Sequence, residues 1–246
     1  SVNPSTCAPD GINSWNPSDI LALQTNQATR AALAQAGPII RIVRSDRSSA
    51  TFYLKKYLAA VDPAFASQIP LDDSNSFPQV SNVVKIRGAD ALSSIVETTP
   101  GAISYQSYQD AAAYGDHRVS IVDNPMMPDA FTEASVDSLA LAAAIIGVDP
   151  LATSTDGTEY MELGVRAGGV HSWPMAFYVN MVVRPQTLSQ YSSCGARKYL
   201  LDMYQWATST TLGRNLLAVR RYVPIPTDVA AKYLYTLQTS LKCNGT

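Results

Sequence analysis

Charged residues are scarce in this sequence. Charged residues make up 15% of the 246-residue chain, and the formal net charge is −2. Soluble proteins typically carry roughly 25% charged residues. Because there is no basic surplus, the charge gives no support for binding to nucleic acid or to an anionic membrane surface. The hydrophobic share of 46% suffices for a sizeable core, so we expect one large globular domain or two small ones.

Features of membrane proteins and metalloproteins are missing as well. No run of about 18 apolar residues occurs, so we expect no membrane span. The three cysteines are Cys7, Cys194 and Cys243, and they show neither C-x-x-C spacing nor a neighbouring histidine. That spacing argues against a zinc site. We therefore expect no bound metal.

Catalytic motifs are also absent. The sequence contains no G-x-S-x-G, no H-E-x-x-H and no glycine-rich phosphate loop, and it has two histidines. His117 has the surroundings of a solvated loop residue, and His171 precedes an apolar run, so we interpret both as structural. These absences predict a protein that is not an enzyme and that carries no cofactor.

Several features that are present favour an oxidising, extracellular compartment. Asn244 begins an Asn-Gly-Thr glycosylation sequon, and the chain has thirteen tyrosines and little surface charge. Cys7, Cys194 and Cys243 are the candidates for one disulfide, and the remaining cysteine is either free or pairs with another chain. We expect a secreted or cell-surface protein whose targeting segment has already been removed.

The hydrophobic periodicity alternates between strand and helix, which predicts an α/β protein. The expected strands are 39–44, 83–87, 102–106, 118–123 and 175–183, and the expected helices are 50–60, 90–97, 135–146, 194–208, 210–218 and 227–241. Clusters of proline and glycine at 61–81, 124–129 and 147–158 are interpreted as connections.

One turn between an expected strand and an expected helix carries polar side chains. In RSDRSSATF, residues 44–52, Arg44 ends the strand, Asp46 lies in the turn and Ser48 stands where the helix begins. A guanidinium fork, a hydroxyl and the free N–H groups of a first helical turn together suit a tetrahedral oxyanion. The alternative is that Ser48 caps the helix and Arg44 simply pairs with Asp46. Asp46 can also serve both arrangements by fixing the Arg44 fork.

This turn resembles the anion loop of the periplasmic phosphate-binding proteins of bacterial phosphate importers, which reads Arg-x-Asp-Gly-Ser-Gly-Thr. The likeness continues in the family's order in RGADALSSIVETTPGAISYQSYQDA, HSWPMAFYVNMVV, LLDMYQWATS and YVPIPTDVAAKYLYTL, and it spans residues 18–242. The resemblance implies a type II periplasmic-binding-protein-like fold, in which two three-layer α/β/α lobes hold phosphate in the cleft between them.

The resemblance also implies roles for individual residues. Arg44 corresponds to the guanidinium donor, Asp46 to its orienting carboxylate and Ser48 to a hydroxyl donor, while Ser49 and Ala50 supply backbone N–H groups.

The sequence departs from the family loop at three positions. Ala50 replaces a threonine whose hydroxyl is a donor in the family, and Arg47 and Ser49 replace glycines. A long cation at position 47 either helps or obstructs an anion. The family also has ligands well upstream of this arginine, and the stretch before Arg44 is too short to hold them. Most of one lobe is therefore expected to be missing.

The expected organisation is a lobe of residues 1–170 that carries the anion loop, followed by residues 171–246, whose returning strand and helices would complete the other lobe. That strand would expose an unpaired apolar edge. The missing lobe is then either a second polypeptide, or a removed segment, or it is supplied by further copies of this chain.

Two functions follow from these observations. The first is a secreted, non-catalytic protein that binds phosphate or a similar oxyanion. The alternative is an extracellular structural or surface-assembly subunit, able to form filaments, that reuses the fold without binding a ligand.

Overall fold

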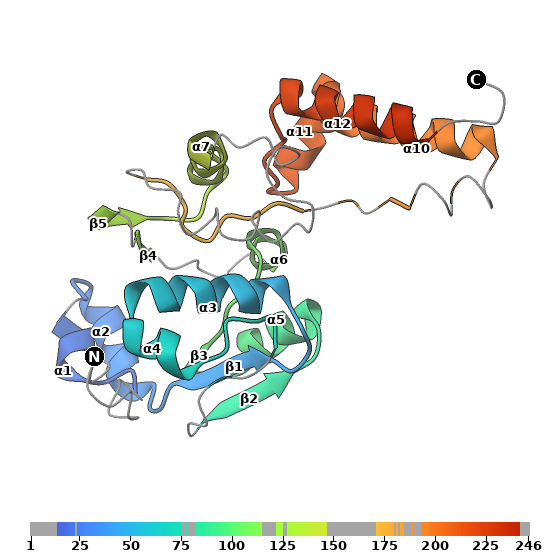
Figure 1. Ribbon diagram of the computed structural model, residues 1–246. Coiled ribbons are helices and arrows are strands. Elements are labelled where there is room, and N and C mark those ends of the chain that lie inside the picture. The colour runs from blue at the N-terminus through green and yellow to red at the C-terminus, as the bar shows by residue number, and fades with distance from the viewer. Residues whose placement is uncertain are drawn as a thin grey trace. The chain divides into compact units, whose positions relative to one another are not determined.

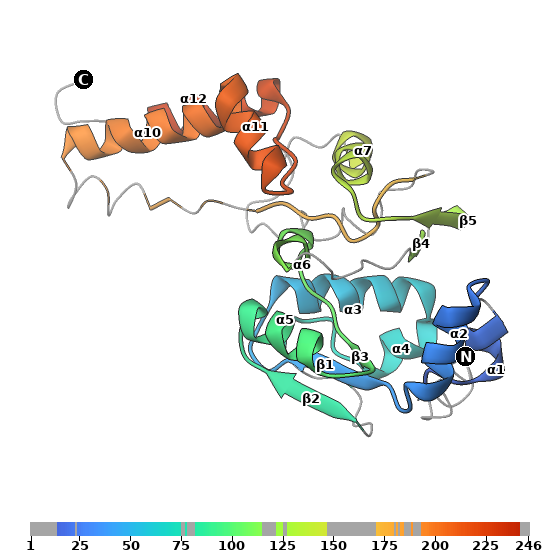
Figure 2. The ribbon, with the colours of Figure 1, turned by 180° about the vertical axis from the view of Figure 1, so that it is seen from behind.

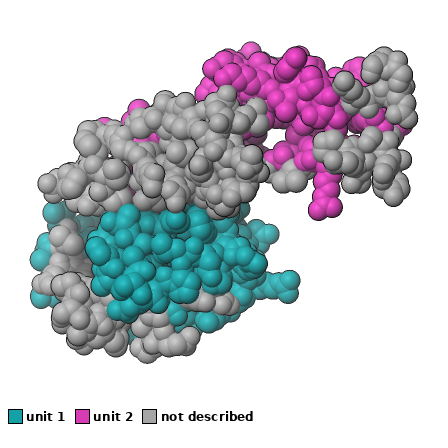
Figure 3. All heavy atoms as spheres, viewed as in Figure 1, with its two compact units in different colours: residues 1–120 teal, residues 121–246 magenta. Residues whose placement is uncertain are grey.

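The computed structural model describes residues 14–22, 24–74, 77, 82–114, 122–124, 127–146, 171–179, 181, 183–184, 188 and 193–241. The chain divides into two compact units, residues 1–120 and residues 121–246, which are coloured separately in Figure 3. Each unit is described by itself.

Unit 1 is built on a parallel sheet of three strands in the order β2-β1-β3. The central strand β1 (Ile40–Arg44) pairs along its length with β2 (Val83–Ile86) and at its start with β3 (Ala102–Ile103). Ile42 and Val43 of β1 are buried. A parallel strand flanked on both sides is the place where a continuous aliphatic run is stable.

Helices surround this sheet. They are α1 (Ser18–Ala22), α2 (Gln27–Gln35), α3 (Ser49–Val61), α4 (Pro63–Gln68), α5 (Ala89–Thr98) and α6 (Tyr108–Ala113). Figure 1 shows α3 running alongside β1, and the view from behind in Figure 2 brings α5 to the front of the sheet. Tyr53 of α3 and Leu92 of α5 join the buried core. Both connections from strand to helix, β1 to α3 and β2 to α5, leave the same carboxyl edge of the sheet.

In the part of unit 2 that the structure describes, there are an antiparallel pair and four helices. The pair is β4 (Val122–Asn124) with β5 (Met127–Thr132), and the helices are α7 (Val136–Ile146), α10 (Cys194–Ser209), α11 (Thr211–Val219) and α12 (Thr227–Ser240). The helix α10 packs against both α11 and α12. The segment 171–179 is attached to α7, because Trp173 donates its backbone N–H to Ser138 O at 3.1 Å and its side chain is buried.

The α/β class is confirmed, with its parallel sheet in unit 1. The six expected helices are all present, and the expected strands 39–44, 83–87 and 102–106 correspond to β1, β2 and a shorter β3. The expected strand 118–123 overlaps β4 at its end, and residues 118–121 lie outside the described residues, as does the connection 147–158.

Three expectations about elements were wrong. The interval 61–81, interpreted as a connection, contains α4, in which Pro63 occupies the first helical turn and Asp62 accepts the N–H of Ala64. Proline is favoured at that position because its missing N–H would have no partner there. The interval 124–129 overlaps β5. The expected strand 175–183 is not formed in its described residues.

The two units end at residues 120 and 246, whereas the expected organisation placed a boundary at residue 170. That assignment to two lobes stays a prediction. No helix within the described ranges is long and apolar enough to cross a membrane.

Candidate functional site

The turn between β1 and α3 forms one polar cluster. Arg44 donates from Nε to Asp46 Oδ1 at 2.7 Å and from Nη2 to Oδ2 at 2.6 Å, a two-point ion pair. Its remaining terminal nitrogen, Nη1, donates to Ser48 Oγ at 3.3 Å. The structure therefore brings together Arg44, Asp46 and Ser48, the three side chains that the sequence singled out.

This ion pair is firmly held. The side chain of Arg44 is 15% exposed and that of Asp46 is 31% exposed. The hydrogen bonds with Arg44 hold the pKa of Asp46 well below its usual range, and those with Asp46 raise the pKa of Arg44. Asp46 Oδ1 also accepts the backbone N–H of Gly88 at 3.2 Å. Because these hydrogen bonds favour the charged forms of both side chains, the pair stays ionised at neutral pH, and its two-point geometry orients the guanidinium plane.

Ser48 stands at the N-cap position of α3 but does not cap it. Its backbone is extended, and its side chain makes no capping hydrogen bond. Its hydroxyl oxygen accepts from Arg44 instead, which leaves the hydroxyl hydrogen able to donate. The alternative interpretation of this turn was that Ser48 caps the helix while Arg44 pairs with Asp46. The Arg44–Asp46 pair is present, and the Ser48 cap is not.

The first turn of α3 leaves backbone donors available. Among the described residues, no acceptor bonds the N–H of Ser49, Ala50 or Thr51. These are the first residues of a thirteen-residue helix, whose amino end attracts negative charge. Ser49 and Ala50 thus occupy the positions expected of backbone donors, beside the hydroxyl of Ser48.

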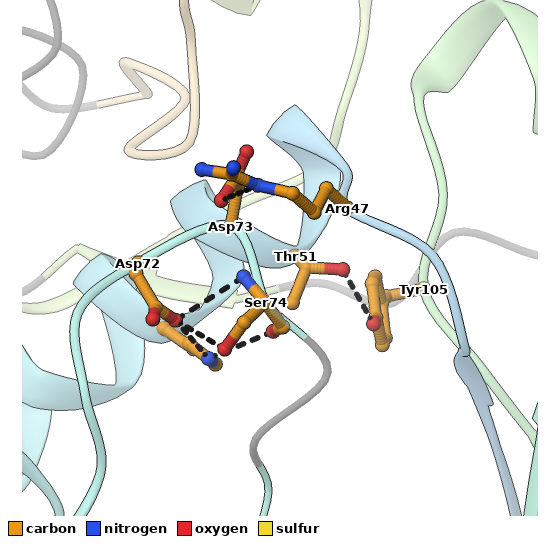
Figure 4. A network of polar contacts seen from close by, with 7 residues as sticks. Arg47, Thr51, Asp72, Asp73, Ser74 and Tyr105 are labelled. Atoms are coloured by element: carbon orange, nitrogen blue, oxygen red, sulfur yellow. Dashed lines mark hydrogen bonds and ion pairs between the residues drawn. The ribbon is translucent and has the colours of Figure 1, made fainter.

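Tyr105 ties the two ends of the turn together. Its hydroxyl oxygen accepts the backbone N–H of Arg44 at 3.3 Å and shares a 2.7 Å hydrogen bond with Thr51 Oγ1. Burial raises the pKa of Tyr105, so its hydroxyl stays protonated at neutral pH. In Figure 4 Thr51 and Tyr105 point toward one another. Thr51 is fully buried. Its hydroxyl therefore stabilises the turn and does not take the place of the family's threonine hydroxyl, which is missing at Ala50.

A segment that follows α4 is fastened along α3. Lys55 of α3 is fully buried and donates to Asp72 Oδ1 and to Ser74 O, both at 2.9 Å. Its ammonium also lies 5.4 Å from the ring centre of Phe77. Asp73 O accepts the backbone N–H of Ser48 at 3.0 Å. Figure 4 shows Asp72, Asp73 and Ser74 in this network. These contacts fix residues 72–74 beside the start of the helix.

Arg47 does not point into the Arg44 cluster. It donates from Nε to Asp73 Oδ1 at 2.7 Å, and its side chain is 81% exposed. No pattern in the sequence indicated this pairing, since the two residues lie in different segments.

The structure adds Gly88 and Tyr105 to the expected residues. Gly88 contributes only its backbone N–H, and it has φ +88°, a region that favours glycine. One signal was present in the sequence: β1 and β2 are neighbouring parallel strands, so the residues that follow them meet at one edge of the sheet. Tyr105 lies in the PGAISY stretch already noted for its family likeness.

The remaining expected residues are placed as follows. Cys194 begins α10 and is not a free thiol. Cys7, Cys243, Asn244 and His117 lie outside the described residues, so the cysteine pairing and the glycosylation stay predictions. His171 is exposed, with φ +69°. The described part of the chain gathers no group of three His, Cys, Asp or Glu side chains that could hold a metal ion.

Comparison with known families gives a match over residues 8–161 to a PBP superfamily domain. The chain belongs to the PBP superfamily. This confirms the likeness seen in the sequence, and the structure is consistent with a partial type II fold of that superfamily. A comparison with curated proteins finds no match.

Among solved structures, this PBP superfamily chain is similar to a human phosphate binding apolipoprotein. The TM-score is 0.55, the sequence identity is 20%, and the match covers 88% of this chain and 66% of that chain. At this identity the likeness concerns the fold. With 66% of that relative covered, the chain spans slightly less than two thirds of its length.

Proposed function

We propose that this protein binds phosphate or a similar oxyanion, without catalysis, at the amino end of α3. The observation that carries the proposal is the fixed Arg44 fork, whose Nη1 reaches Ser48 Oγ next to the unbonded N–H groups of Ser49 and Ala50. The Arg44 guanidinium, the Ser48 hydroxyl and the two backbone N–H groups can each donate a hydrogen bond to a tetrahedral anion. The structurally similar human apolipoprotein is named as phosphate binding, which supports the choice of anion.

Affinity is expected to be moderate. Ala50 lacks the hydroxyl that the family loop carries, and each charge-assisted hydrogen bond that is missing costs roughly 1.5–3 kcal/mol. Titration calorimetry with orthophosphate tests the proposal. Dissociation constants from micromolar to low millimolar support it, and the absence of heat at millimolar orthophosphate contradicts it.

Ser48→Ala is the sharpest variant for this test, because it removes one donor and leaves the Arg44–Asp46 pair in place. We expect binding to weaken by about tenfold, the loss of one such hydrogen bond. Ser67→Ala is the matched control: Ser67 lies on α4, away from the Arg44 cluster, and its exposed hydroxyl donates to Ala64 O at 2.8 Å. Equal affinity of both variants would contradict the assignment of Ser48.

A second candidate function, assembly at an extracellular surface, is favoured by one feature of unit 2. Both α10 and α11 expose apolar side chains at helical spacing, and we name these the α10–α11 surface: Tyr199, Met203, Trp206, Leu212, Leu216 and Val219. Large apolar and aromatic side chains of this kind are enriched in protein interfaces. Either a second polypeptide or another copy of the chain would cover them.

Sedimentation velocity tests the assembly function. Self-association that is lost in Met203→Glu and Leu216→Glu, and retained in Val61→Glu, supports it; Val61 is an exposed apolar residue of α3 in unit 1. A wild-type protein that remains monomeric at high concentration contradicts self-assembly. Secretion, a disulfide that includes Cys194 and glycosylation at Asn244 belong to this proposal and to the first one alike.

A further inference from the structure

Arg47 is the one residue of the turn whose charge the proposed oxyanion site does not use. Its side chain is 81% exposed, and its contact within the described residues is the 2.7 Å ion pair from Nε to Asp73 Oδ1. Its two terminal nitrogens have no acceptor in the same part of the chain. A guanidinium held by Nε alone keeps four N–H donors for another partner.

The residue that holds Arg47 is itself fixed. Asp73 lies between Asp72 and Ser74, which both accept hydrogen bonds from the buried ammonium of Lys55. The backbone carbonyl of Asp73 accepts the N–H of Ser48. Figure 4 shows Arg47 extending toward Asp73 at the start of α3. Arg47 is thus held by the side chain of the same residue whose backbone carbonyl bonds Ser48, the N-cap residue of the proposed site.

The charges around Arg47 determine which kind of anion it can bind. Asp73 largely neutralises Arg47, so at a distance the pair adds little attraction for a small anion. A direct hydrogen bond to the terminal nitrogens is different, because guanidinium forks bind phosphate oxygens at two points. Such a bond requires a ligand that extends beyond the donors of Arg44, Ser48 and the helix.

We propose that Arg47 is a second guanidinium of the site and selects a diphosphate group over orthophosphate. The inner phosphate occupies the donors of Arg44, Ser48 and the first turn of α3, and the outer phosphate bonds the terminal nitrogens of Arg47. This inference rests on the proposed oxyanion function. Ala50 is consistent with this inference. It lacks the threonine hydroxyl of the family loop, so the inner phosphate has one donor fewer, and the contact of the outer phosphate with Arg47 adds a donor.

The test is a calorimetric titration of the full chain with four ligands in buffer free of divalent metals: orthophosphate, methyl phosphate, pyrophosphate and ADP. We expect pyrophosphate to bind about fivefold more tightly than orthophosphate, the effect of one exposed charge pair. Methyl phosphate should gain nothing, since its substituent is uncharged. ADP distinguishes a nucleotide from free diphosphate: tighter binding than pyrophosphate indicates that the site also accepts the nucleoside.

Arg47→Gln should abolish the preference for pyrophosphate and leave orthophosphate affinity within about twofold, because exposed charges contribute little at a distance. Arg30→Gln is the charge-matched control: Arg30 is an exposed residue of α2 that donates to Gln24 O, and its variant should keep the preference. Raising the ionic strength should shrink the preference in the wild type.

The outcomes separate the two proposals. Equal affinity for orthophosphate and pyrophosphate, a preference that survives Arg47→Gln, or tighter orthophosphate binding in that variant would overturn the role of Arg47 and leave the oxyanion site standing. A folded wild-type protein that binds none of the four anions would overturn both. Circular dichroism of each variant establishes that it is folded.

Discussion

At the scale of single residues, the turn after β1 depends on groups that lie far away in the sequence. Arg44 is oriented by Asp46, Asp46 is held by the N–H of Gly88, and the backbone of Arg44 is held by Tyr105. Each of these hydrogen bonds is partly buried, and it satisfies an N–H group that water reaches poorly. The polar cluster is therefore stabilised as a network, and the removal of one member should affect its neighbours.

Tyr105→Phe tests the support of the turn. The variant keeps the ring, which lies 5.9 Å from that of Phe77, and removes the hydroxyl shared by Arg44 N–H and Thr51. We expect a loss of about 1–3 kcal/mol in the free energy of unfolding, because partners in a buried place are left unbonded. Orthophosphate binding should weaken by about threefold as the ends of the turn loosen. Chemical denaturation and calorimetry measure the two effects.

Tyr114→Phe is the control for that variant. Its hydroxyl is exposed and makes a 3.4 Å hydrogen bond with Asp90 O, so the change in the free energy of unfolding should stay within about 0.5 kcal/mol. If Tyr105→Phe is as mild as this control, the hydroxyl of Tyr105 does not support the turn.

Asp72 gives the stability a dependence on pH. Hydrogen bonds from Ser74 and Lys55 lower the pKa of Asp72 from 3.8 to about 2. A carboxyl whose pKa is lower in the folded state contributes stability above its unfolded pKa, and it loses that contribution as the pH falls through the folded pKa. The contribution is therefore complete above about pH 4 and disappears by about pH 2.

The measurement is the free energy of unfolding of the wild type and of Asp72→Asn at several pH values. The wild type should be the more stable protein at neutral pH, and the difference should shrink between pH 4 and pH 2. A difference that does not change over this interval would show that the pair with Lys55 makes no contribution through the charge of Asp72.

At the scale of elements, the contact between α10 and α11 depends on one glycine. A Cβ added at Gly213 would lie 2.2 Å from Trp206 O and 2.9 Å from Ala207 Cα. Both atoms belong to the backbone of α10 and cannot rotate away. Gly213→Ala should therefore destabilise unit 2 by about 1–3 kcal/mol, the usual cost of overpacking. Thermal denaturation followed by circular dichroism measures it.

Gly195→Ala is the matched control on α10. The nearest atom to its added Cβ is Ser193 Oγ at 3.7 Å, an ordinary contact. Alanine also favours a helix over glycine by up to about 1 kcal/mol, so this variant should be as stable as the wild type or slightly more so. If both variants were destabilised equally, the close approach of Gly213 to the backbone of α10 would not explain the loss of stability.

The elements also show what the sequence could and could not predict. The helices α3 and α5 and the strands β1 and β2 were predicted because their apolar residues repeat with the period of the element. The segment 175–183 has the composition of a strand, but a strand also requires a neighbour to bond, and periodicity does not reveal whether one exists. The interval 61–81 was interpreted as a connection because prolines cluster there, although Pro63 lies in a first helical turn, where proline is favoured.

The candidate site divides in the same way. Arg44, Asp46 and Ser48 lie within five residues of one another, so the sequence alone could predict that they meet. Gly88 and Tyr105 come from later segments, and Gly88 acts through a backbone N–H that every residue except proline has. The pairing of Arg47 with Asp73 depends on the path of the segment after α4, which only the folded chain defines.

At the scale of the whole molecule, all the described contacts of the candidate site lie within unit 1. The cluster comprises residues 44–51, 72–74, 77, 88 and 105, and each hydrogen bond described for it joins two residues of the range 1–120. Unit 1 also has its own buried core, which includes Ile39, Ile42 and Leu92. A unit with its own core can fold alone.

A fragment of residues 1–120 should therefore fold and bind orthophosphate with an affinity within about threefold of that of the full chain, since all the donors described for the site belong to unit 1. Circular dichroism and calorimetry on the fragment and the full chain test this expectation. A fragment that is folded but binds at least tenfold more weakly would mean that unit 2 supplies donors, as in a cleft between two lobes. Ser48→Ala in the fragment separates the cases, because it should weaken the remaining binding only if the anion still lies at the start of α3.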